Sequence, residues 1–579
     1  MATNKSTRDV VVVASLVVAA IVMVLANVLA DRKFSRLDLT SESRYSVSDP
    51  FRNILGRLKD PATITYYTLK QVPTSFESRK RDILDKLNEI KTVANGKVEI
   101  EVIDPTENKE LREKLQKEGF EHPYQEFNKD QVSVSNIYSG MKVTYQDKPT
   151  GSLPGIGDAE QLEYALGSIL MELTMTKKPV IAIQAPPAPQ QPPQFGGQQR
   201  QQGSGYEWLA SGQWEDGKKF DIKQVDISEN TPIPADAALL MLIRPKELNE
   251  RQRYEVAKYL AGGGKVLLLA SPFKMSRDFG WHAEKSPTGL EDYLKECGIT
   301  FGQDFVADKS NLDLSFVDMF SGRRTRIRTP FFVKIKAENI DQTSVLTRLM
   351  PELVMPFPAE IKTDDAQAKK NGLALSILAK TSTQSWTKPY TDQFDPDKEG
   401  KYDDATQQTD GSKTIFISEE GQFPFPYDGK PVPPWSAEKP EDKDKNKDKK
   451  PETASVTKKP GRLLICSAPD AFNETYLSDQ TLGQQLRGNI YLVLNIATTC
   501  GLGDDMTNLR VKQYETRAIK SLVGKENDRS RNWLKAALIA GMPALVIIVA
   551  LVRTLLRRST QNRYERNLAK TIGPSSFSP

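Results

Sequence analysis

A glycine-rich stretch followed by a lysine is the first feature that could carry chemistry. Residues 262–264 are glycines and Lys265 follows, and successive backbone N–H groups beside a lysine can cradle phosphate. The full phosphate-binding pattern also requires Gly where Tyr259 stands and Ser or Thr where Val266 stands. The loop also leads from a predicted helix into a strand, so an anion would meet the carbonyl end of the helix. The glycines therefore predict a left-handed helix cap.

The thiols are the next candidates. Three cysteines occur, Cys297, Cys466 and Cys500. The number is odd, the spacing is wide and no Cys-x-x-Cys is present, so the pattern indicates neither a disulfide framework nor a thiol-bound metal. Cys466 follows a predicted strand, where a nucleophile could stand, but no flanking glycines and no histidine partner accompany it. We predict that Cys466 and Cys297 are small apolar core residues.

Histidine and acidic side chains give little support for catalysis. His122 and His282 are the two histidines, and neither lies beside metal-spaced ligands or a G-x-S-x-G turn. Asp395 to Gly400 resembles the start of a calcium loop, but Thr406 stands where the loop needs its twelfth-position acid. We predict a surface turn there, and no catalytic residue, cofactor or metal in the chain.

The charge balance argues against nucleic acid as a partner. The 579 residues carry a net charge of +5, which is too small to indicate a nucleic-acid-binding protein. With 38% hydrophobic and 27% charged residues, the composition is that of a folded protein. One basic run could meet lipid headgroups or an acidic partner, but such a run is usually a solvated hairpin, and this is our prediction. Its members are Arg323, Arg324, Arg326 and Arg328.

Two apolar stretches near the ends of the chain predict membrane spans. Val10 to Ala30 is uncharged over about 20 residues, which matches the hydrocarbon core of a bilayer. Ala536 to Val552 is shorter and contains Pro543, but its flanks extend it to residues 533–556, with Trp533 as an interfacial anchor. A cleaved signal peptide is the alternative for the first stretch, and a buried core helix is the alternative for the second.

Lysine and arginine near the spans predict the orientation. The tail after the second span has Glu565 as its single acid and is rich in basic residues, so it should stay in the cytoplasm. These basic residues are Arg553, Arg557, Arg558, Arg563, Arg566 and Lys570. Two spans then place both termini in the cytoplasm of a bacterial cell, at its inner membrane, and the large middle outside.

The residues after the first span predict a βαβ unit. A short amphipathic helix at Phe51 to Leu58 precedes a strand at Thr63 to Thr68, a helix with apolar residues at helical spacing, and an alternating strand around residues 97–105. A parallel strand pair with a crossover helix is the economical reading. The unit resembles a thioredoxin-like domain, but TLKQVPTSF stands where a redox Cys-x-x-Cys would lie. Redox chemistry is therefore not expected.

A second α/β segment begins with a helix at Asp158 to Met175. Its clearest part is a buried strand at Ala238 to Ile243, a helix opened by Asn249 with Gln252 three residues on, and a second buried strand at Val266 to Ala270. Continuous apolar strands flanking a helix predict a parallel sheet covered on both faces. Further on we expect a β-rich layer, a strand in GRLLICSAPD and a helix in LRGNIYLVLNIATTCGL.

Two segments lack the apolar residues needed for a core. Residues 185–205 are rich in Pro, Gln and Gly, and are either an exposed excursion or a partner contact. Residues 436–462 contain hardly any apolar side chain, so burial cannot offset the entropy of ordering them. We predict that 436–462 is a disordered insertion.

Several blocks together resemble the GldG family, among them RLDLTSESRYSVSDPFRNILGRLKDPATITYY and IRPKELNERQRYEVAKYLAGGGKVLLLASPF. Members are membrane-anchored auxiliary components of ABC transport systems, some associated with gliding motility. The resemblance implies an α/β extracytoplasmic body related to glutamine-amidotransferase-like (Rossmann-like) folds, beside a separate multi-span permease and a separate ATPase. After the strand ending near Ile183, this chain lacks the Gly-His-Gly-Glu-like turn common in that family, which puts a ligand role for that turn in doubt.

The expected organisation follows from these readings. The chain should be a non-enzymatic, two-span accessory protein with no nucleic-acid partner, and homo-oligomerisation stays open. A structural envelope or motility adaptor is the alternative function, and an unrecognised hydrolase or carbohydrate-binding enzyme is a third. The expected segments are a cytoplasmic N-terminus (1–9), a first span (10–30), a thioredoxin-like domain (31–155), an amidotransferase-like domain (156–310), a continued α/β body with a β-rich insertion (311–510), a linker (511–532), a second span (533–556) and a basic cytoplasmic tail (557–579).

Overall fold

The computed structural model describes most of the central part of the chain. The described ranges are 46–128, 131–186, 204–212, 214, 217–227, 231–276, 281–317, 324–435, 452–479 and 482–513, with scattered residues between 532 and 563. The chain forms two compact units, Met1–Gln513 and Tyr514–Pro579. Within the described residues, no helix combines the length and the apolar character needed to cross a bilayer. Residues 10–30, and most of 533–556, lie outside the described residues.

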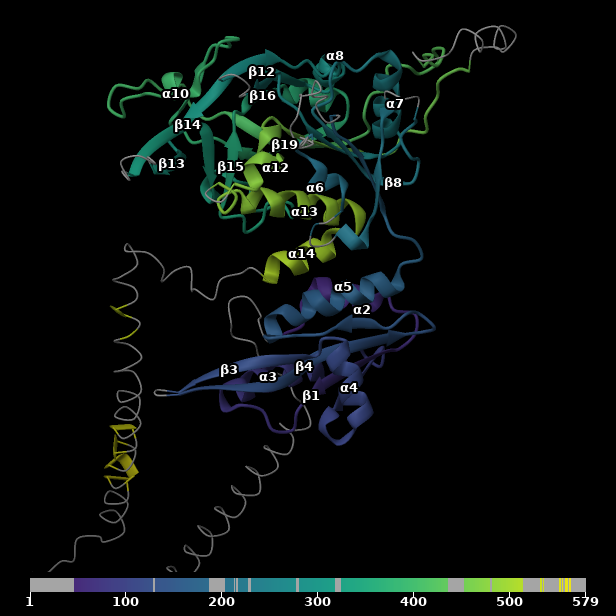
Figure 1. Cartoon of the computed structure of the whole chain (residues 1–579), viewed down its shortest axis with the longest axis vertical. Coiled ribbons are helices and arrows are strands. Elements are labelled where there is room, and N and C mark those ends of the chain that lie inside the picture. The colour runs from purple at the N-terminus through teal and green to yellow at the C-terminus, as the bar shows by residue number, and fades with distance from the viewer. Residues whose placement is uncertain are drawn as a thin grey trace, which may run out of the picture. The chain divides into compact units, whose positions relative to one another are not determined.

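The N-terminal part contains a five-stranded sheet in the order β2-β1-β4-β3, with β5 paired to β4. β1 and β2 are parallel and joined by α3, which confirms the predicted crossover unit. The long antiparallel hairpin β3–β4 extends this sheet (Figure 1) and was not predicted. The elements are α2 (Asp49–Gly56), β1 (Ala62–Thr68), α3 (Thr74–Val93), β2 (Val98–Ile103), η1 (Pro105–Glu107), α4 (Lys109–Lys117), β3 (Glu121–Asn128), β4 (Gln131–Tyr145) and β5 (Gly151–Leu153).

A seven-stranded sheet forms the centre of the next part, in the order β17-β19-β20-β9-β8-β6-β7. The five strands from β20 to β7 are parallel, whereas β19 and β17 run antiparallel to their neighbours. The chain therefore has a mixed α/β fold with a mainly parallel central sheet. The strands are β6 (Val180–Gln184), β7 (Asp221–Gln224), β8 (Ala237–Ile243), β9 (Lys265–Leu269), β17 (Leu373–Lys380), β19 (Thr414–Gly421) and β20 (Gly461–Cys466).

The unit from β8 through α7 (Glu250–Ala261) to β9 forms as predicted. Asn249 caps α7, and its side chain and that of Gln252 bond each other's backbone N–H groups in a capping box. Gly263 adopts φ +95°, the left-handed conformation that ends the helix, and a Cβ there would lie 2.9 Å from the Cβ of Lys459. The glycine-rich stretch is therefore a helix cap, and the phosphate-loop reading is excluded on geometry.

Helices cover both faces of the seven-stranded sheet. α13 (Arg487–Gly501) packs on one face, in the core that contains Leu492 and Ile496. α7 and α8 (Glu291–Glu296) pack on the other, in the core that contains Val256 and Leu294. The sheet is thus buried on both sides, as its continuous apolar strands predicted. Between the two sheets lie η2 (Ala159–Gln161) and α5 (Leu162–Thr174), and short α6 (Glu207–Ala210) and η3 (Gly217–Lys219) precede β7.

Small sheets with their own aromatic core form a β-rich layer, but three of its strands, β10 to β12, precede residue 311, where the predicted insertion was to begin. β12 lies between β16 and β18, β14 lies between β13 and β15, and β10 pairs with β11. Phe305 and Phe394 stack at the centre of this core, with ring centroids 3.9 Å apart. The strands are β10 (Phe273–Ser276), β11 (His282–Lys285), β12 (Ile299–Asp308), β13 (Asn311–Val317), β14 (Arg324–Lys336), β15 (Glu352–Pro356), β16 (Ala359–Thr363) and β18 (Ser385–Lys388).

Part of the segment predicted to be disordered is instead built into the fold. The backbone of Ala454 exchanges hydrogen bonds with Lys430 and Gly429, and Lys459 N donates to Ala261 O. The Ala454 side chain is buried among the residues that cover α7. The prediction is therefore wrong for residues 452–462, because backbone pairing to neighbouring loops holds a segment that has few apolar side chains. Residues 436–451 lie outside the described residues.

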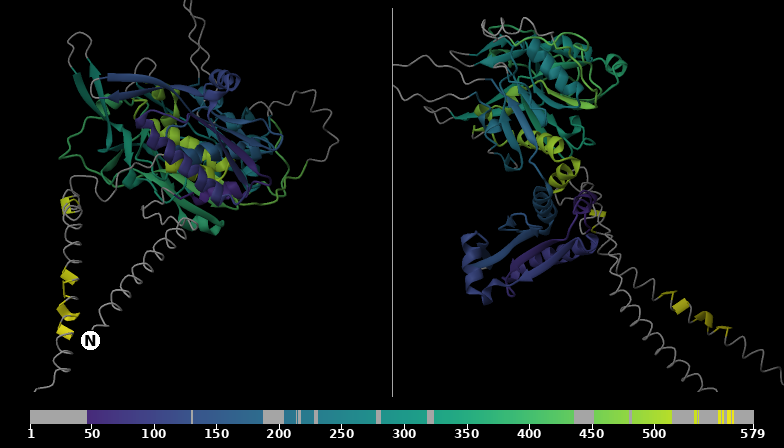
Figure 2. Two further views of the ribbon diagram at one scale, coloured as in Figure 1. Left: turned by 90° about the horizontal axis from the view of Figure 1, so that it is seen from below. Right: turned by 90° about the vertical axis from the view of Figure 1, so that its right-hand side faces the viewer.

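The last helix of the first unit, α14 (Asp504–Gln513), connects the two sheet-containing parts. It packs against α13 on one side and against α2 and α5 on the other. Figure 2 shows α14, in yellow-green, beside the purple α2, so segments from the two ends of this unit lie together. The remaining short helices are η5 (Ala337–Asn339), α9 (Asp365–Lys370), α10 (Pro396–Glu399), η6 (Pro469–Phe472) and α12 (Glu474–Leu477).

Candidate functional site

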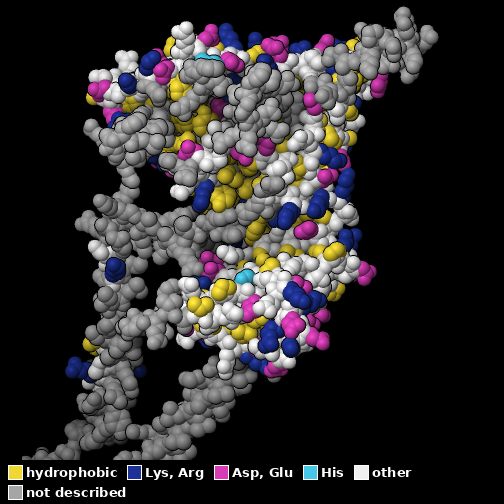
Figure 3. Space-filling model, viewed as in Figure 1, with side chains coloured by type: hydrophobic (Ala, Val, Ile, Leu, Met, Phe, Trp, Pro, Cys, Tyr) yellow, Lys and Arg dark blue, Asp and Glu magenta, His cyan; other side chains and the backbone are white. Residues whose placement is uncertain are grey.

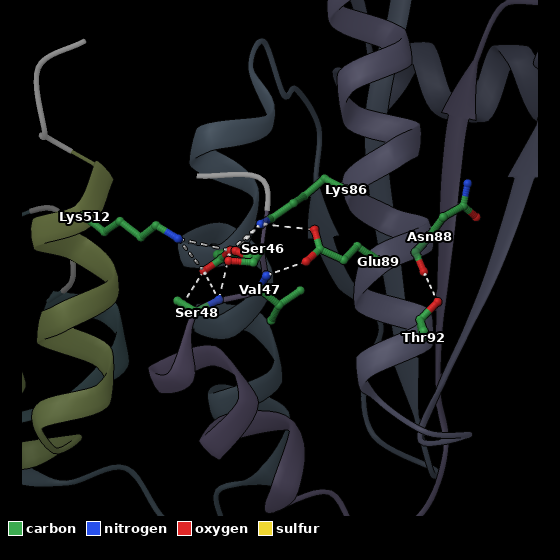
Figure 4. A network of polar contacts seen from close by, with 9 residues as sticks. Ser46, Val47, Ser48, Lys86, Asn88, Glu89, Thr92 and Lys512 are labelled. Atoms are coloured by element: carbon green, nitrogen blue, oxygen red, sulfur yellow. Dashed lines mark hydrogen bonds and ion pairs between the residues drawn. The ribbon is translucent and has the colours of Figure 1, made fainter. Parts of the chain in front are cut away.

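One buried carboxylate links residues near the first and the last described positions of the first unit. Glu163 of α5 accepts a hydrogen bond from the hydroxyl of Ser48, the residue before α2. Its Oε1 lies 2.7 Å from Lys86 Nζ of α3 and 3.4 Å from Lys512 Nζ of α14. Figure 4 shows Ser48, Lys86 and Lys512 pointing toward one another from the segment before α2, from α3 and from α14. We call Ser48, Lys86, Glu163 and Lys512 the carboxylate clasp.

A second carboxylate holds the residues just before α2. Val47 N donates to Glu89 Oε1 at 2.7 Å, and Lys86 Nζ lies 3.7 Å from Glu89 Oε2. Lys86 also donates to the carbonyl oxygen of Ser46 at 2.9 Å. Residues 46–48 are therefore fixed by three consecutive contacts to α3 and α5, at the point where the described chain begins.

The electrostatics of the clasp depend on burial and on two ammonium groups. The side chains of Glu163 and Lys86 are 5% and 8% exposed. Burial alone would raise the pKa of Glu163, but the charges of Lys86 and Lys512, with hydrogen bonds from Lys86 and Ser48, outweigh it and lower this pKa. Glu163 is thus held as an anion, and removing one member of such a buried pair is expected to be costly.

Two further contacts attach α14 to the N-terminal part. Asp505 accepts hydrogen bonds from Arg57 at 2.7 Å and from Asn53 at 2.9 Å. Arg510 is buried on α14, and its Nε and Nη2 donate to the hydroxyl of Tyr164 at 3.3 Å. Charged contacts therefore follow α14 over its whole length, from Asp505 to Lys512.

The carboxyl edge of the seven-stranded sheet is the second candidate site. In chain order the five parallel strands lie 2-1-3-4-5, so the switch point where such sheets bind ligands falls between β6 and β8. Arg244 follows β8 there, with φ +44°, a strained value for a side-chain-bearing residue. Its Nη2 lies 2.7 Å from Asp470 Oδ1, and its Nε donates to the Tyr206 hydroxyl at 3.2 Å.

Arg244 and Asp470 form a buried ion pair at the carboxyl edge of the seven-stranded sheet. Burial would lower the pKa of Arg244, but Asp470 and Tyr206 outweigh it and raise this pKa, while burial raises the pKa of Tyr206. Gln184 Oε1 and Ser271 Oγ, which end or follow β6 and β9, are buried without a partner among the described residues. The geometry provides a charged anchor, but not a nucleophile paired with a base.

An aromatic groove of about 440 Å³ lies between α6, α12 and α13. Trp208 and Trp214 line it with Tyr491, and Arg487 and Glu474 bring opposite charges to its lining. The indole N–H of Trp208 donates to Phe472 O at 2.9 Å, so this ring is fixed. On the face shown in Figure 3, hydrophobic side chains gather over α13 and charges of both signs are interspersed around them. Such a lining suits an apolar or aromatic group with polar substituents.

Comparison with known proteins assigns a family. A family model described as "ABC-type uncharacterized transport system" matches residues 178–496, more than half of the chain. The chain belongs to this auxiliary family of ABC transport systems. A second model, a domain of unknown function (DUF7088), matches residues 41–144. No curated protein matches.

One solved structure resembles this ABC-transport auxiliary protein only weakly. It is a putative ThuA-like protein from Bacteroides uniformis, 9% identical, which covers 57% of this chain and 97% of its own, with a TM-score of 0.28. That score is too low to carry an argument about fold or activity.

The structure confirms the prediction that Cys297 and Cys466 of the auxiliary protein are core residues, and it buries Cys500 as well. Cys297, Cys466 and Cys500 are buried and free. Burial raises the pKa of the Cys466 thiol to about 12 and that of Cys500 to about 11, and it also raises the pKa of Cys297. Thiolates are therefore scarce at neutral pH, which argues against nucleophilic roles.

The other residues considered from the sequence are dispersed. His122 Nε2 lies 3.1 Å from the carbonyl oxygen of Pro154, whereas His282 lies 3.5 Å from Glu284 on β11. No group of metal-ligand side chains occurs in the described parts of the chain. The acidic turn at residues 395–400 contains the short helix α10, and the basic run occupies the β13–β14 hairpin, where Arg328 pairs with Asp404. Arg323 lies outside the described residues.

Sequence reasoning missed the carboxylate clasp and the Arg244–Asp470 pair. Glu163 and Lys86 sit on helices whose apolar residues were read correctly, but their charges looked like ordinary solvated positions. The sequence did contain a signal for Arg244, because a charged residue directly after a fully apolar strand lies at the carboxyl edge of the sheet. Its partner Asp470 follows β20 more than two hundred positions later, so local spacing could not connect them.

Proposed function

We propose that this chain is a membrane-anchored, non-catalytic accessory subunit of a GldG-type ABC transport system. It would work beside a separate multi-span permease and a separate ATPase, with residues 10–30 and 533–556 crossing the bacterial inner membrane. Both termini would lie in the cytoplasm and the α/β body outside. The thioredoxin-like and amidotransferase-like character of the two sheet-containing parts belongs to this proposal.

The observation that carries the proposal is the carboxylate clasp. Ser48 and Lys512 contact the same carboxylate of Glu163. The first and the last described residues of the body therefore lie close together, which suits a domain tethered at both ends to one membrane surface. The sheet edge where doubly wound folds place their active sites is occupied by the Arg244–Asp470 pair, which supports an accessory rather than a catalytic role.

A structural envelope or motility adaptor is the competing function. It would use the same anchored body and could use the aromatic groove for a protein partner. The two functions differ in the proteins they require, because an adaptor needs neither a permease nor an ATPase.

Affinity purification of the tagged full-length protein in mild detergent separates these functions. We expect a multi-span permease and an ABC ATPase to be recovered with it, identified by mass spectrometry, because the glycine-rich stretch at residues 262–264 is a helix cap and not a phosphate-binding loop. An untagged strain processed in parallel is the control. Recovery of neither protein across several detergents would reject the transport role and favour the adaptor.

Thiol labelling tests the proposed sidedness. Because the three native thiols are buried, the native protein should react with a membrane-impermeant maleimide only after denaturation. The exposed Lys430 of the body offers a site for K430C, which we expect to label in spheroplasts. S559C, in the proposed cytoplasmic tail, should label only after lysis. Labelling of K430C that requires lysis would contradict an extracytoplasmic body.

A further inference from the structure

The aromatic groove between α6, α12 and α13 has a wall that internal contacts hold in place. Trp208 and Trp214 form this wall. The indole N–H of Trp208 donates to Phe472 O at 2.9 Å, and that of Trp214 donates to Leu209 O at 3.3 Å. Phe220 also stacks on the Trp214 ring, with centroids 5.5 Å apart. Rings held in this way lose little further freedom when an apolar group packs on them.

A second wall of the groove is one face of α13. Ile490, Tyr491 and Leu494 line it. With Arg487 they follow the i, i+3, i+4, i+7 spacing that places side chains on one side of a helix. Leu494 is 2% exposed, whereas Ile490 and Tyr491 are half-buried. The groove thus combines a buried apolar floor with partly accessible apolar sides, and its volume of about 440 Å³ falls within the range of small-molecule sites.

Two opposite charges at the groove have no ionic partner among the described residues. Glu474 and Arg487 both line the groove, and both are exposed. In the described part of the chain, neither side chain forms a salt bridge or a hydrogen bond, with the other or with a third group. The groove therefore offers one free carboxylate and one free guanidinium group beside its apolar lining.

Helix stabilisation explains one of these charges but not the other. Glu474 stands in the first turn of α12, where the helix dipole favours an acid. Arg487 is the first residue of α13, a helix of 15 residues whose N-terminus has no side-chain cap, and the dipole disfavours a cation there. The same helix end favours an anion. A carboxylate bound at Arg487 would therefore be stabilised by the guanidinium group and by the helix.

We propose that the aromatic groove binds a zwitterion with an apolar body, an amino acid or a short peptide with apolar side chains. Its carboxylate would lie at Arg487, its ammonium group at Glu474, and its apolar part against Trp208, Ile490 and Tyr491. An uncharged apolar occupant would leave both charges without a counter-charge, whereas a zwitterion pairs each of them. Such binding needs neither a permease nor an ATPase, so it would remain if the transport role were rejected.

Calorimetric titration of the full-length protein in detergent tests the proposal. L-phenylalanine and the dipeptide L-leucyl-L-phenylalanine are the probes, and N-acetyl-L-phenylalanine amide, which lacks both charges, is the uncharged counterpart. We expect at least one probe to bind at least about tenfold more tightly than the counterpart, because the counterpart loses both charge-assisted contacts. Tighter binding of the dipeptide identifies a peptide ligand, whereas tighter binding of phenylalanine identifies a free amino acid.

Removing one charge from the protein and one from the ligand assigns the two contacts. R487Q should weaken binding of the better probe at least about tenfold, and the remaining affinity should not change when the carboxylate of the probe is amidated. E474Q should have the same effect, with an affinity that does not change when the amino group of the probe is acetylated. Both side chains are exposed, so we expect both variants to keep the thermal stability of the native protein.

Arg81 of α3 and Glu110 in the first turn of α4 provide matched controls, because both are exposed and neither lines the groove. R81Q and E110Q should leave the affinity unchanged. Three results would overturn the proposal: binding of neither probe by the native protein, equally tight binding of the uncharged counterpart, or equal weakening in the groove variants and their controls.

Discussion

Replacing Glu163 by glutamine is expected to lower the free energy of unfolding by about 3–5 kcal/mol, the usual cost of breaking a buried ion pair. Among the described residues, the change leaves the ammonium group of Lys86, 8% exposed, with the more distant Glu89 carboxylate and a backbone carbonyl. It also removes the anion that Lys512 contacts. Denaturant unfolding of the full-length protein in detergent at neutral pH measures this loss.

Glu172 supplies the control for this variant, because it is exposed on the same helix. E172Q should change stability by no more than about 0.5 kcal/mol. A similar small effect for both variants would show that the clasp does not hold the unit together.

Acid titration gives a second, independent measure of the clasp. The folded-state pKa of Glu163 lies below its ordinary value of 4.5, so its contribution to stability is present above that value and is lost as pH falls through the lower, folded-state pKa. The stability difference between the native protein and E163Q should therefore shrink as the pH drops below about 4.5. A difference that stays constant down to strongly acidic pH would mean that the charge of Glu163 is not what stabilises the fold.

Local sequence patterns predicted the fold correctly where the residues that determine an element lie within one short segment. The β8–α7–β9 unit follows from two apolar runs, the Asn249–Gln252 capping box and the glycine stop at Gly263. The parallel β1–α3–β2 unit follows from the same kind of periodicity. In each, the residues that determine the structure lie close together in sequence, so spacing alone identifies them.

The carboxylate clasp could not be predicted in this way, because it depends on tertiary contacts. Ser48 and Lys512 lie near opposite ends of the first unit and meet only because α14 packs on α2 and α5. The backbone pairing of residues 452–460 has the same origin, since loops distant in sequence provide the partners. Charge composition shows that such residues exist, but not which of them converge.

A buried carboxylic acid on β19, the strand next to the edge strand β17 of the seven-stranded sheet, leads to the second large prediction. Glu419 of β19 is fully buried, and its register places it between Leu375 and Leu463 of the neighbouring strands. Neither carboxyl oxygen has a hydrogen-bond partner among the described residues. Burial raises the pKa of Glu419 to about 8, so the folded protein keeps this group protonated near neutral pH.

Stability should therefore fall as pH rises, opposite in sign to the effect of Glu163. The unfolded chain releases the Glu419 proton near its ordinary pKa of 4.5, whereas the folded protein retains it until about 8. Between these values the protein should lose up to about 5 kcal/mol of stability from this group alone. E419Q, which mimics the protonated acid, should remove this loss and be more stable than the native protein at pH 8, while matching it near pH 4.5, in unfolding experiments across that range.

Its neighbour Glu420 is a matched control, because it is exposed and pairs with Arg462 at the surface. E420Q should change stability by less than about 1 kcal/mol at any pH in this range. Parallel pH profiles for E419Q and the native protein would show that Glu419 ionises freely in the folded state, which would require water or a polar partner to reach the sheet interior. A stability profile that diverges from that of the native protein for E419Q, but not for E420Q, would establish that the surroundings of Glu419 exclude water. An apolar side chain at this position would then stabilise the protein above neutral pH.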